Sequence, residues 1–172
     1  LDLTKAYDSL DPSRTVAILE AYGVGPRLRH FISVIWEKDV LVPRAGGFYG
    51  HMFHAERGLR QGDIMSPILF NIVVDCVIRE WHAHIDNDPE LSSLRALFYA
   101  DDGLLAGYSV VSTQRGMDAL DTLFKRVGLF MNPTKTKSMI SAGACPYGSI
   151  SAEGYKRRFD ASLPSYSRLF LP

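Results

Sequence analysis

The chain has 172 residues, of which 47% are hydrophobic, and it carries 19 acidic and 19 basic side chains. This length suits a single domain with a substantial buried core, and the zero net charge lacks the basic excess that is usual in nucleic-acid-binding proteins. No run of about 20 apolar residues and no amino-terminal basic and apolar segment predicts a membrane span or a signal peptide.

The first part of the chain is expected to form a strand followed by two helices. Residues 1–5 are predicted as a short apolar strand. Asp11-Pro12 predicts a helix start, because an aspartate side chain caps a first turn well and proline fits the first helical position. Gly23 is expected to end that helix, and a second helix is predicted over residues 26–38.

The middle of the chain predicts a hairpin and then a long helix. Gly46-Gly47 stands between β-prone stretches, which indicates a hairpin within residues 39–57. Ser66-Pro67 is a second cap-plus-proline helix start, and apolar residues recur at helical spacing from there to Trp81. We expect this helix to be largely buried.

The remaining elements are predicted from alternating apolar residues and turn residues. Strands are expected over residues 95–100 and 103–108, on either side of the acidic pair Asp101-Asp102. A helix is predicted over residues 113–127, followed by two short strands around Asn132-Pro133.

Strands mixed with helices predict an α+β fold, in which helices pack on one face of an antiparallel sheet. Residues 1–141 are expected to form this unit. Residues 142–172 are rich in Ser, Gly, Tyr and Arg and are expected to be an irregular extension. The basic run at residues 156–158 suits either a nucleic-acid contact or a solvated surface, and both interpretations stay open.

The adjacent carboxylates Asp101 and Asp102 lie between apolar runs and precede Gly103. Asp-Gly is typical of tight hairpin turns, so a surface turn without a ligand explains this segment when it is taken alone. A further carboxylate on an apolar strand, Asp2, favours a metal site, because Mg²⁺ is commonly held by one or two carboxylates plus substrate phosphates. We therefore expect Asp2 to lie beside the Asp101-Asp102 turn.

Four segments in a fixed order resemble the catalytic motifs of reverse transcriptases. They are LDLTKAYD (residues 1–8), RGLRQGDIMSPILF (57–70), FYADD (98–102) and GLFMNPTKTK (128–137). Their lettering is more similar to non-LTR retrotransposon and group II intron enzymes than to retroviral ones. The resemblance implies a polymerase palm, in a fragment of a longer polyprotein that lacks most of the fingers and the thumb.

The resemblance also implies RNA-directed DNA polymerase activity through two Mg²⁺ ions, with Mn²⁺ as an alternative metal. Asp2, Asp101 and Asp102 are the implied catalytic and metal-binding residues, and the carbonyl of Leu3 is an implied backbone ligand. The implied partners are an RNA template, a DNA primer and dNTPs. Without the fingers and thumb, we expect the fragment alone to extend a primer poorly or not at all.

Four further residues are implied to bind the nucleotide. Tyr7 matches the aromatic gate beneath the sugar, which favours deoxynucleotides; without the surrounding motif, a half-buried packing ring would be the preferred explanation. Gln61 and Gly62 match the segment that meets the incoming nucleotide and the template base. Lys135 matches the basic residue near the leaving pyrophosphate, with Lys137 as an alternative.

Other interpretations remain open at this point. Arg57 and Arg60 suit either template phosphates or plain solvent exposure. An RNA-dependent RNA polymerase and a non-catalytic remnant that binds nucleic acid are the two rival functions. The first would normally carry Gly where Ala100 stands, and it would prefer ribonucleotides.

Overall fold

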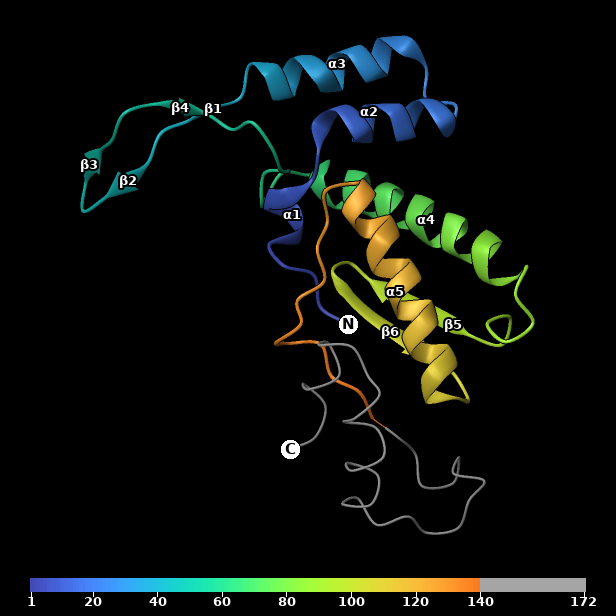
Figure 1. The fold of residues 1–172 in the computed structure, drawn as a ribbon. Coiled ribbons are helices and arrows are strands. Elements are labelled where there is room, and N and C mark those ends of the chain that lie inside the picture. The colour runs from blue at the N-terminus through green and yellow to red at the C-terminus, as the bar shows by residue number, and fades with distance from the viewer. Residues whose placement is uncertain (140–172) are drawn as a thin grey trace.

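The computed structural model describes residues 1–139, which form a mixed fold of helices and small antiparallel sheets (Figure 1). The helices of this part are α1 (Ala6–Ser9), α2 (Pro12–Ala21), α3 (Pro26–Glu37), α4 (Ser66–Ile85) and α5 (Val110–Arg126). The strands pair as β1 (Val40–Leu41) with β4 (Phe53–His54), β2 (Arg44–Ala45) with β3 (Phe48–Tyr49), and β5 (Arg95–Tyr99) with β6 (Asp102–Ala106).

The hairpin β5–β6 is extended by two segments that are distant in sequence. Asp2 forms an antiparallel bridge with Asp102 of β6, and Leu3 forms another with Met131. Backbone hydrogen bonds hold both junctions, from Gly103 N to the Leu1 carbonyl at 2.9 Å and from Asn132 N to the Asp2 carbonyl at 2.8 Å. We call β5, β6, residues 1–3 and residues 130–132 the central sheet.

Helices α4 and α5 pack against each other, and α5 also packs on the central sheet (Figure 1). The inner face of the hairpin contributes Phe98, whose ring meets the edge of Phe124 on α5 at a centroid distance of 5.6 Å. On α4, Trp81 is fully buried and donates its indole hydrogen bond to the Gly116 carbonyl at 2.8 Å. This contact satisfies the one polar atom of a large apolar ring, as buried tryptophans require.

A long hairpin, which we call the arm (residues 40–54), extends away from the helices (Figure 1). Its strands β1 to β4 make their main contacts with one another. At the tip, Gly46 and Gly47 both have positive φ, 56° and 87°. This is the backbone pattern of a two-residue hairpin turn, so the Gly-Gly signal predicted the hairpin correctly.

The predicted helices are confirmed with some shifted ends. Asp11 caps α2 as expected, and α3 ends one residue before the predicted end. The start at Ser66 is confirmed, but Ser66 is the first helical residue and its side chain caps nothing; Met65 holds the cap position. Helix α5 begins at Val110 rather than 113, because the Ser109 carbonyl and hydroxyl already accept bonds from the first turn.

Two predictions are wrong in this part of the chain. The predicted strand 1–5 is only the bridge pair Asp2-Leu3, after which Lys5 turns the chain into α1. Of the two strands expected around Asn132-Pro133, only Met131 pairs; the segment after Pro133 is a turn within the described residues.

The predictions for residues 142–172 and for the basic run 156–158 lie outside the described residues. Within residues 1–139, no helix has both the length and the apolar character that crossing a membrane would require.

Candidate functional site: a carboxylate pair on the central sheet

The structure brings Asp2 and Asp102 together as directly opposite residues of the central sheet. Opposite residues of an antiparallel pair project from the same face, with Cβ atoms about 4.5 to 5.5 Å apart. That face is the exposed one, since Tyr99 and Asp102 are exposed while Phe98 and Gly103 turn inward. The expected adjacency of the amino-terminal carboxylate and the acidic hairpin is therefore present.

The hairpin turn itself lies one residue earlier than predicted. Tyr99 pairs with Asp102, so the central residues of the turn are Ala100 and Asp101, and Asp102 belongs to β6. The positive φ that the Asp-Gly pattern assigned to glycine falls on Ala100, at 52°. Gly103 is needed for a different reason: a Cβ there would lie 2.4 Å from the Phe98 ring.

Two strained backbone positions lie close to the carboxylates in the sequence. Lys5 and Ala100 are the non-glycine residues of the described chain with positive φ, at 45° and 52°. A side chain in this region costs free energy, and such outliers cluster at functional sites. Lys5 turns the chain immediately after the Asp2 strand, and Ala100 precedes Asp101, so both positions hold a carboxylate-bearing segment in place.

One carboxylate oxygen of Asp2 is left without a hydrogen bond. Asp2 Oδ2 is buried and has no hydrogen-bond partner among residues 1–139. The Lys135 ammonium lies 3.9 Å from it, and the Asp2 amide donates to the Thr136 hydroxyl at 3.3 Å. A buried carboxylate oxygen is costly unless a cation or donor meets it, so this atom is available to a cation.

The position of Lys135 follows from the turn at Asn132. The Asn132 side-chain oxygen accepts from the amides of Thr134 and Lys135, at 3.1 and 3.3 Å, and from the Thr134 hydroxyl at 2.8 Å. This side-chain turn is typical of asparagine. It directs Lys135 toward Asp2, so of the two lysines that the sequence left open, Lys135 is the one that forms an ion pair with the site.

The three acidic side chains do not form a ready-made ligand cluster. Within the described part of the chain, no group of three or more His, Cys, Asp or Glu side chains is arranged to hold a metal ion. The donor set nevertheless suits Mg²⁺, which takes oxygen ligands and commonly uses one or two carboxylates with substrate phosphates. The paired Asp2 and Asp102 and the unbonded Asp2 oxygen fit that requirement.

Tyr7 is half-buried and lies flat against Phe70 of α4, with ring centroids 4.8 Å apart and an interplanar angle of 18°. Its carbonyl accepts the Leu59 amide at 2.7 Å. The ring of Tyr7 is therefore fixed by α4, and its backbone by the segment that leads into α4. The ring packs as the packing interpretation expected, and the residue as a whole is only partly buried.

The segment that carries Gln61 and Gly62 is anchored to α1 through glycine. Gly58 has φ of 93°, and a Cβ there would lie 2.7 Å from the Asp8 Cα. Gln61 and Gly62 form an exposed turn closed by the bond from Asp63 N to the Arg60 carbonyl at 3.3 Å. Gly62, with φ of 93°, supplies the positive φ that the third position of such a turn needs.

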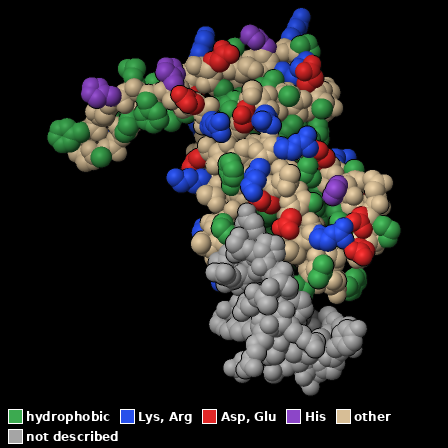
Figure 2. Space-filling model, in the orientation of Figure 1, with side chains coloured by type: hydrophobic (Ala, Val, Ile, Leu, Met, Phe, Trp, Pro, Cys, Tyr) green, Lys and Arg blue, Asp and Glu red, His purple; other side chains and the backbone are tan. Residues whose placement is uncertain are grey.

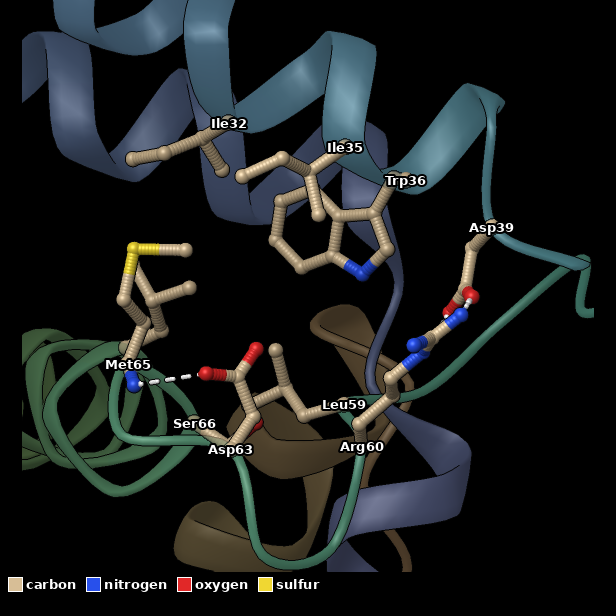
Figure 3. Close-up of a pocket in the computed structure, with 10 residues that line it drawn as sticks. Ile32, Ile35, Trp36, Asp39, Leu59, Arg60, Asp63, Met65 and Ser66 are labelled. Atoms are coloured by element: carbon tan, nitrogen blue, oxygen red, sulfur yellow. Dashed lines mark hydrogen bonds and ion pairs between the residues drawn. The ribbon is translucent and has the colours of Figure 1, made fainter.

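The Arg60 side chain is 49% exposed, but its guanidinium is already engaged by a carboxylate. Its guanidinium forms a two-pronged ion pair with Asp39, with the Nε bond at 2.6 Å (Figure 3). Asp39 is 7% exposed, at the end of α3 where the arm begins. The pair closes one side of a small pocket whose remaining lining is mostly apolar, including Trp36 and Leu59, with Asp63 and Ser66 as further polar residues.

Sequence reasoning missed Asp39, because a single Asp after a helix carries no motif. Its position between a helix end and the arm, 21 residues before Arg60, gives a pairing that only the fold reveals.

Comparison with known proteins identifies the family of this chain. Residues 1–160 match the family described as "Reverse transcriptase (RNA-dependent DNA polymerase)". The chain belongs to the reverse transcriptase family. The resemblance seen in the four motifs is therefore confirmed over most of the chain.

Similar proteins are Pol polyproteins of R2 non-LTR retrotransposons. The chain is 30% identical over 135 residues to the Pol polyprotein of the type-2 retrotransposable element R2DM of Drosophila melanogaster, covering 78% of this chain and 13% of that protein. It is 26% identical over 156 residues to that of an R2 element of Nasonia vitripennis, covering 91% and 15%. It is 28% identical over 148 residues to that of an R2 element of Popillia japonica, covering 83% of this chain and 24% of that protein. The chain thus spans less than a quarter of the length of each of these relatives.

Proposed function

We propose that this chain is the catalytic palm of an RNA-directed DNA polymerase that adds dNTPs to a primer 3′-hydroxyl. The palm comprises residues 1–141, and the surrounding protein is a retrotransposon Pol polyprotein. The pairing of Asp2 with Asp102 is the observation that carries the proposal, because two carboxylates a hundred residues apart share one exposed face of the sheet.

Asp2, Asp101 and Asp102 are the proposed metal-binding and catalytic residues. The Leu3 carbonyl is a further proposed ligand. Leu3 lies opposite Met131, but the backbone hydrogen bonds beside this pair are made by the amides of Thr4 and Asn132, not by Leu3 and Met131 themselves. In such a pair the residue's own carbonyl faces away from its partner, here toward the β6 side. When bound, Mg²⁺ supplies charge that stabilises the triphosphate and the attacking hydroxyl.

The nucleotide is proposed to lie between the central sheet and the start of α4. Tyr7, held by Phe70, sets the room beneath the sugar and excludes a 2′-hydroxyl by bulk. The exposed turn of Gln61 and Gly62 is proposed to meet the nucleotide and the template base. Lys135 is proposed to meet the pyrophosphate, and its ion pair with Asp2 indicates that its ammonium reaches the carboxylate face.

Primer extension tests this function. A DNA primer on an RNA template is extended with Mg²⁺ by the Pol polyprotein that contains this chain, comparing dNTPs with rNTPs. We expect dNTP incorporation, and we expect Asp101→Ala to abolish it. Asp86→Ala, at an exposed aspartate after α4, is the matched control and should keep full activity.

Each alternative gives a different result. Unchanged dNTP incorporation by Asp101→Ala contradicts the metal assignment, and preference for rNTPs indicates an RNA polymerase instead. The isolated 172-residue chain is expected to extend the primer poorly or not at all, so vigorous extension by this chain would refute the requirement for further domains.

A further inference from the structure

The arm carries several exposed large apolar side chains close together in the sequence. Phe48 is 81% exposed and Tyr49 is 70% exposed, and Met52 and Phe53 nearby are also exposed. Figure 2 shows apolar and histidine side chains gathered on this projection, away from the helices. Exposed single apolar residues are ordinary, but several at the tip of one projection indicate an interaction surface.

The two rings at the tip face opposite sides of the ribbon. Phe48 pairs with Ala45 and Tyr49 pairs with Arg44, and successive strand residues point to opposite faces. Phe48 is therefore opposite a methyl group that leaves its ring uncovered, whereas Tyr49 is opposite the long side chain of Arg44.

The charged residues of the arm indicate which kind of partner would bind it. Residues 40–54 contain Arg44, His51 and His54 but no Asp or Glu, whereas residues 61–120 carry nine acidic and three basic side chains. The Arg44 guanidinium lies over the Tyr49 ring, 5.4 Å from its centroid. Cationic and aromatic side chains without carboxylates suit a phosphate backbone with accessible bases.

We propose that the arm is a stacking platform for single-stranded nucleic acid, separate from the polymerase site. Phe48 and Tyr49 stack on unpaired bases, and Arg44 contacts a phosphate while supporting the Tyr49 ring. The proposal goes beyond the polymerase function, because it concerns binding and stands even if the carboxylate site proves inactive.

Fluorescence anisotropy with the 172-residue chain and a labelled 15-nucleotide RNA without secondary structure tests the platform. The double variant Phe48→Ala/Tyr49→Ala should bind about tenfold or more weakly, since a stacked base depends strongly on its aromatic partner. Phe31→Ala is the matched control, because Phe31 is a 55% exposed aromatic residue on α3, outside the arm. Its affinity should stay within about twofold of the wild type.

Two further measurements separate stacking from charge and from misfolding. Arg44→Gln should reduce the slope of log K against log salt by about 0.7, the value for one contact with a single strand. Thermal unfolding of the double variant should match the wild type, because both rings are exposed.

Several results would overturn the proposal. They are no RNA binding by the wild type, equal affinity of the double variant, and equal affinity for a blunt RNA duplex. Photo-crosslinking of 4-thiouridine RNA should label peptides within residues 44–54; labels found only elsewhere would also overturn it.

Discussion

The central sheet and the arm are both built on antiparallel hairpins, but α5 packs on one face of the central sheet, whereas the strands of the arm make their main contacts with one another. The outer face of the central sheet is exposed like the arm, as Tyr99 at 86% shows. In the body that carries the central sheet, rings such as Phe70, Trp81 and Phe124 are completely buried, whereas Phe48 and Tyr49 of the arm are largely exposed. The difference shows that hydrophobic composition alone does not decide burial; the partners that the fold brings to each hairpin decide it.

The two regions also differ in how far apart along the chain their contacts are. The central sheet is closed by bonds between segments about a hundred residues apart, such as Gly103 to Leu1 and Asn132 to Asp2. The arm pairs only with itself over short distances, from Val40 to His54 at most. We therefore expect the body to unfold as one unit and the arm to open locally at a low free-energy cost.

The largest contrast is expected between two phenylalanines. Phe124→Ala should lower the free energy of unfolding by about 3 to 5 kcal/mol, since it empties a buried site against Phe98. Phe48→Ala should change it by less than about 0.5 kcal/mol. Urea denaturation measures both, and a large loss for Phe48→Ala would show that the arm belongs to the core.

Two glycines with similar backbone angles extend the comparison. Gly58→Ala should lower the free energy of unfolding by roughly 2 to 4 kcal/mol. The new methyl group would clash with the Asp8 backbone, and alanine is strained at a positive φ. Gly47→Ala faces open space at φ of 87°, and local opening of the arm should absorb its strain. Its global stability should therefore stay near that of the wild type in the same denaturation experiment; equal losses for the two variants would contradict this.

Two tyrosines separate the two proposed roles. Tyr7→Ala in the Pol polyprotein should raise rNTP incorporation relative to dNTP by about tenfold, a change of about 1.4 kcal/mol in discrimination. Tyr7→Phe keeps the bulk and should keep the selectivity, and Tyr49→Ala should leave it unchanged. Single-nucleotide incorporation kinetics measure these ratios, and unchanged selectivity of Tyr7→Ala would remove the gate assignment.

The smallest effect concerns a helix cap in the body. Asp11 accepts from the amides of Ser13 and Arg14 at 2.9 and 3.1 Å, and the Ser13 hydroxyl bond lowers the pKa of its carboxyl. Asp11→Ala should cost about 1 kcal/mol at neutral pH, whereas Asp11→Asn should retain most of the cap.

Because the folded pKa is lowered, this contribution is present above the unfolded value near 3.8 and is lost as pH falls through the folded value. Stability curves of wild type and Asp11→Ala should therefore converge below about pH 3.8. Curves that stay parallel in acid would show that the carboxylate charge is not what stabilises the helix.

Local signals predicted most of the helices. Asp11 caps α2 through side-chain hydrogen bonds, and Pro12 and Pro67 suit the first turns of α2 and α4 through their fixed φ. The hairpin was predicted less accurately, because the expected strands put the turn on Asp101 and Asp102, whereas Ala100 and Asp101 form it and Gly103 pairs with Phe98 inside the hairpin.

The sequence motifs predicted which residues belong to the site, but not how their side chains are arranged in space. The motifs named Asp2 and the acidic hairpin, and the pairing with Asp102 follows that expectation. The ion pair of Arg60 with Asp39 and the approach of Lys135 to Asp2 depend on long-range folding, although the Asn132 turn that precedes Lys135 is itself local.

Binding of Mn²⁺ to the 172-residue chain, followed by electron paramagnetic resonance, tests most directly whether Asp2 and the acidic hairpin form a cation site. We predict saturable binding that is lost in Asp2→Asn and in Asp101→Asn and retained in Asp86→Asn. Absence of saturable binding, or equal binding by all these variants, would contradict the account.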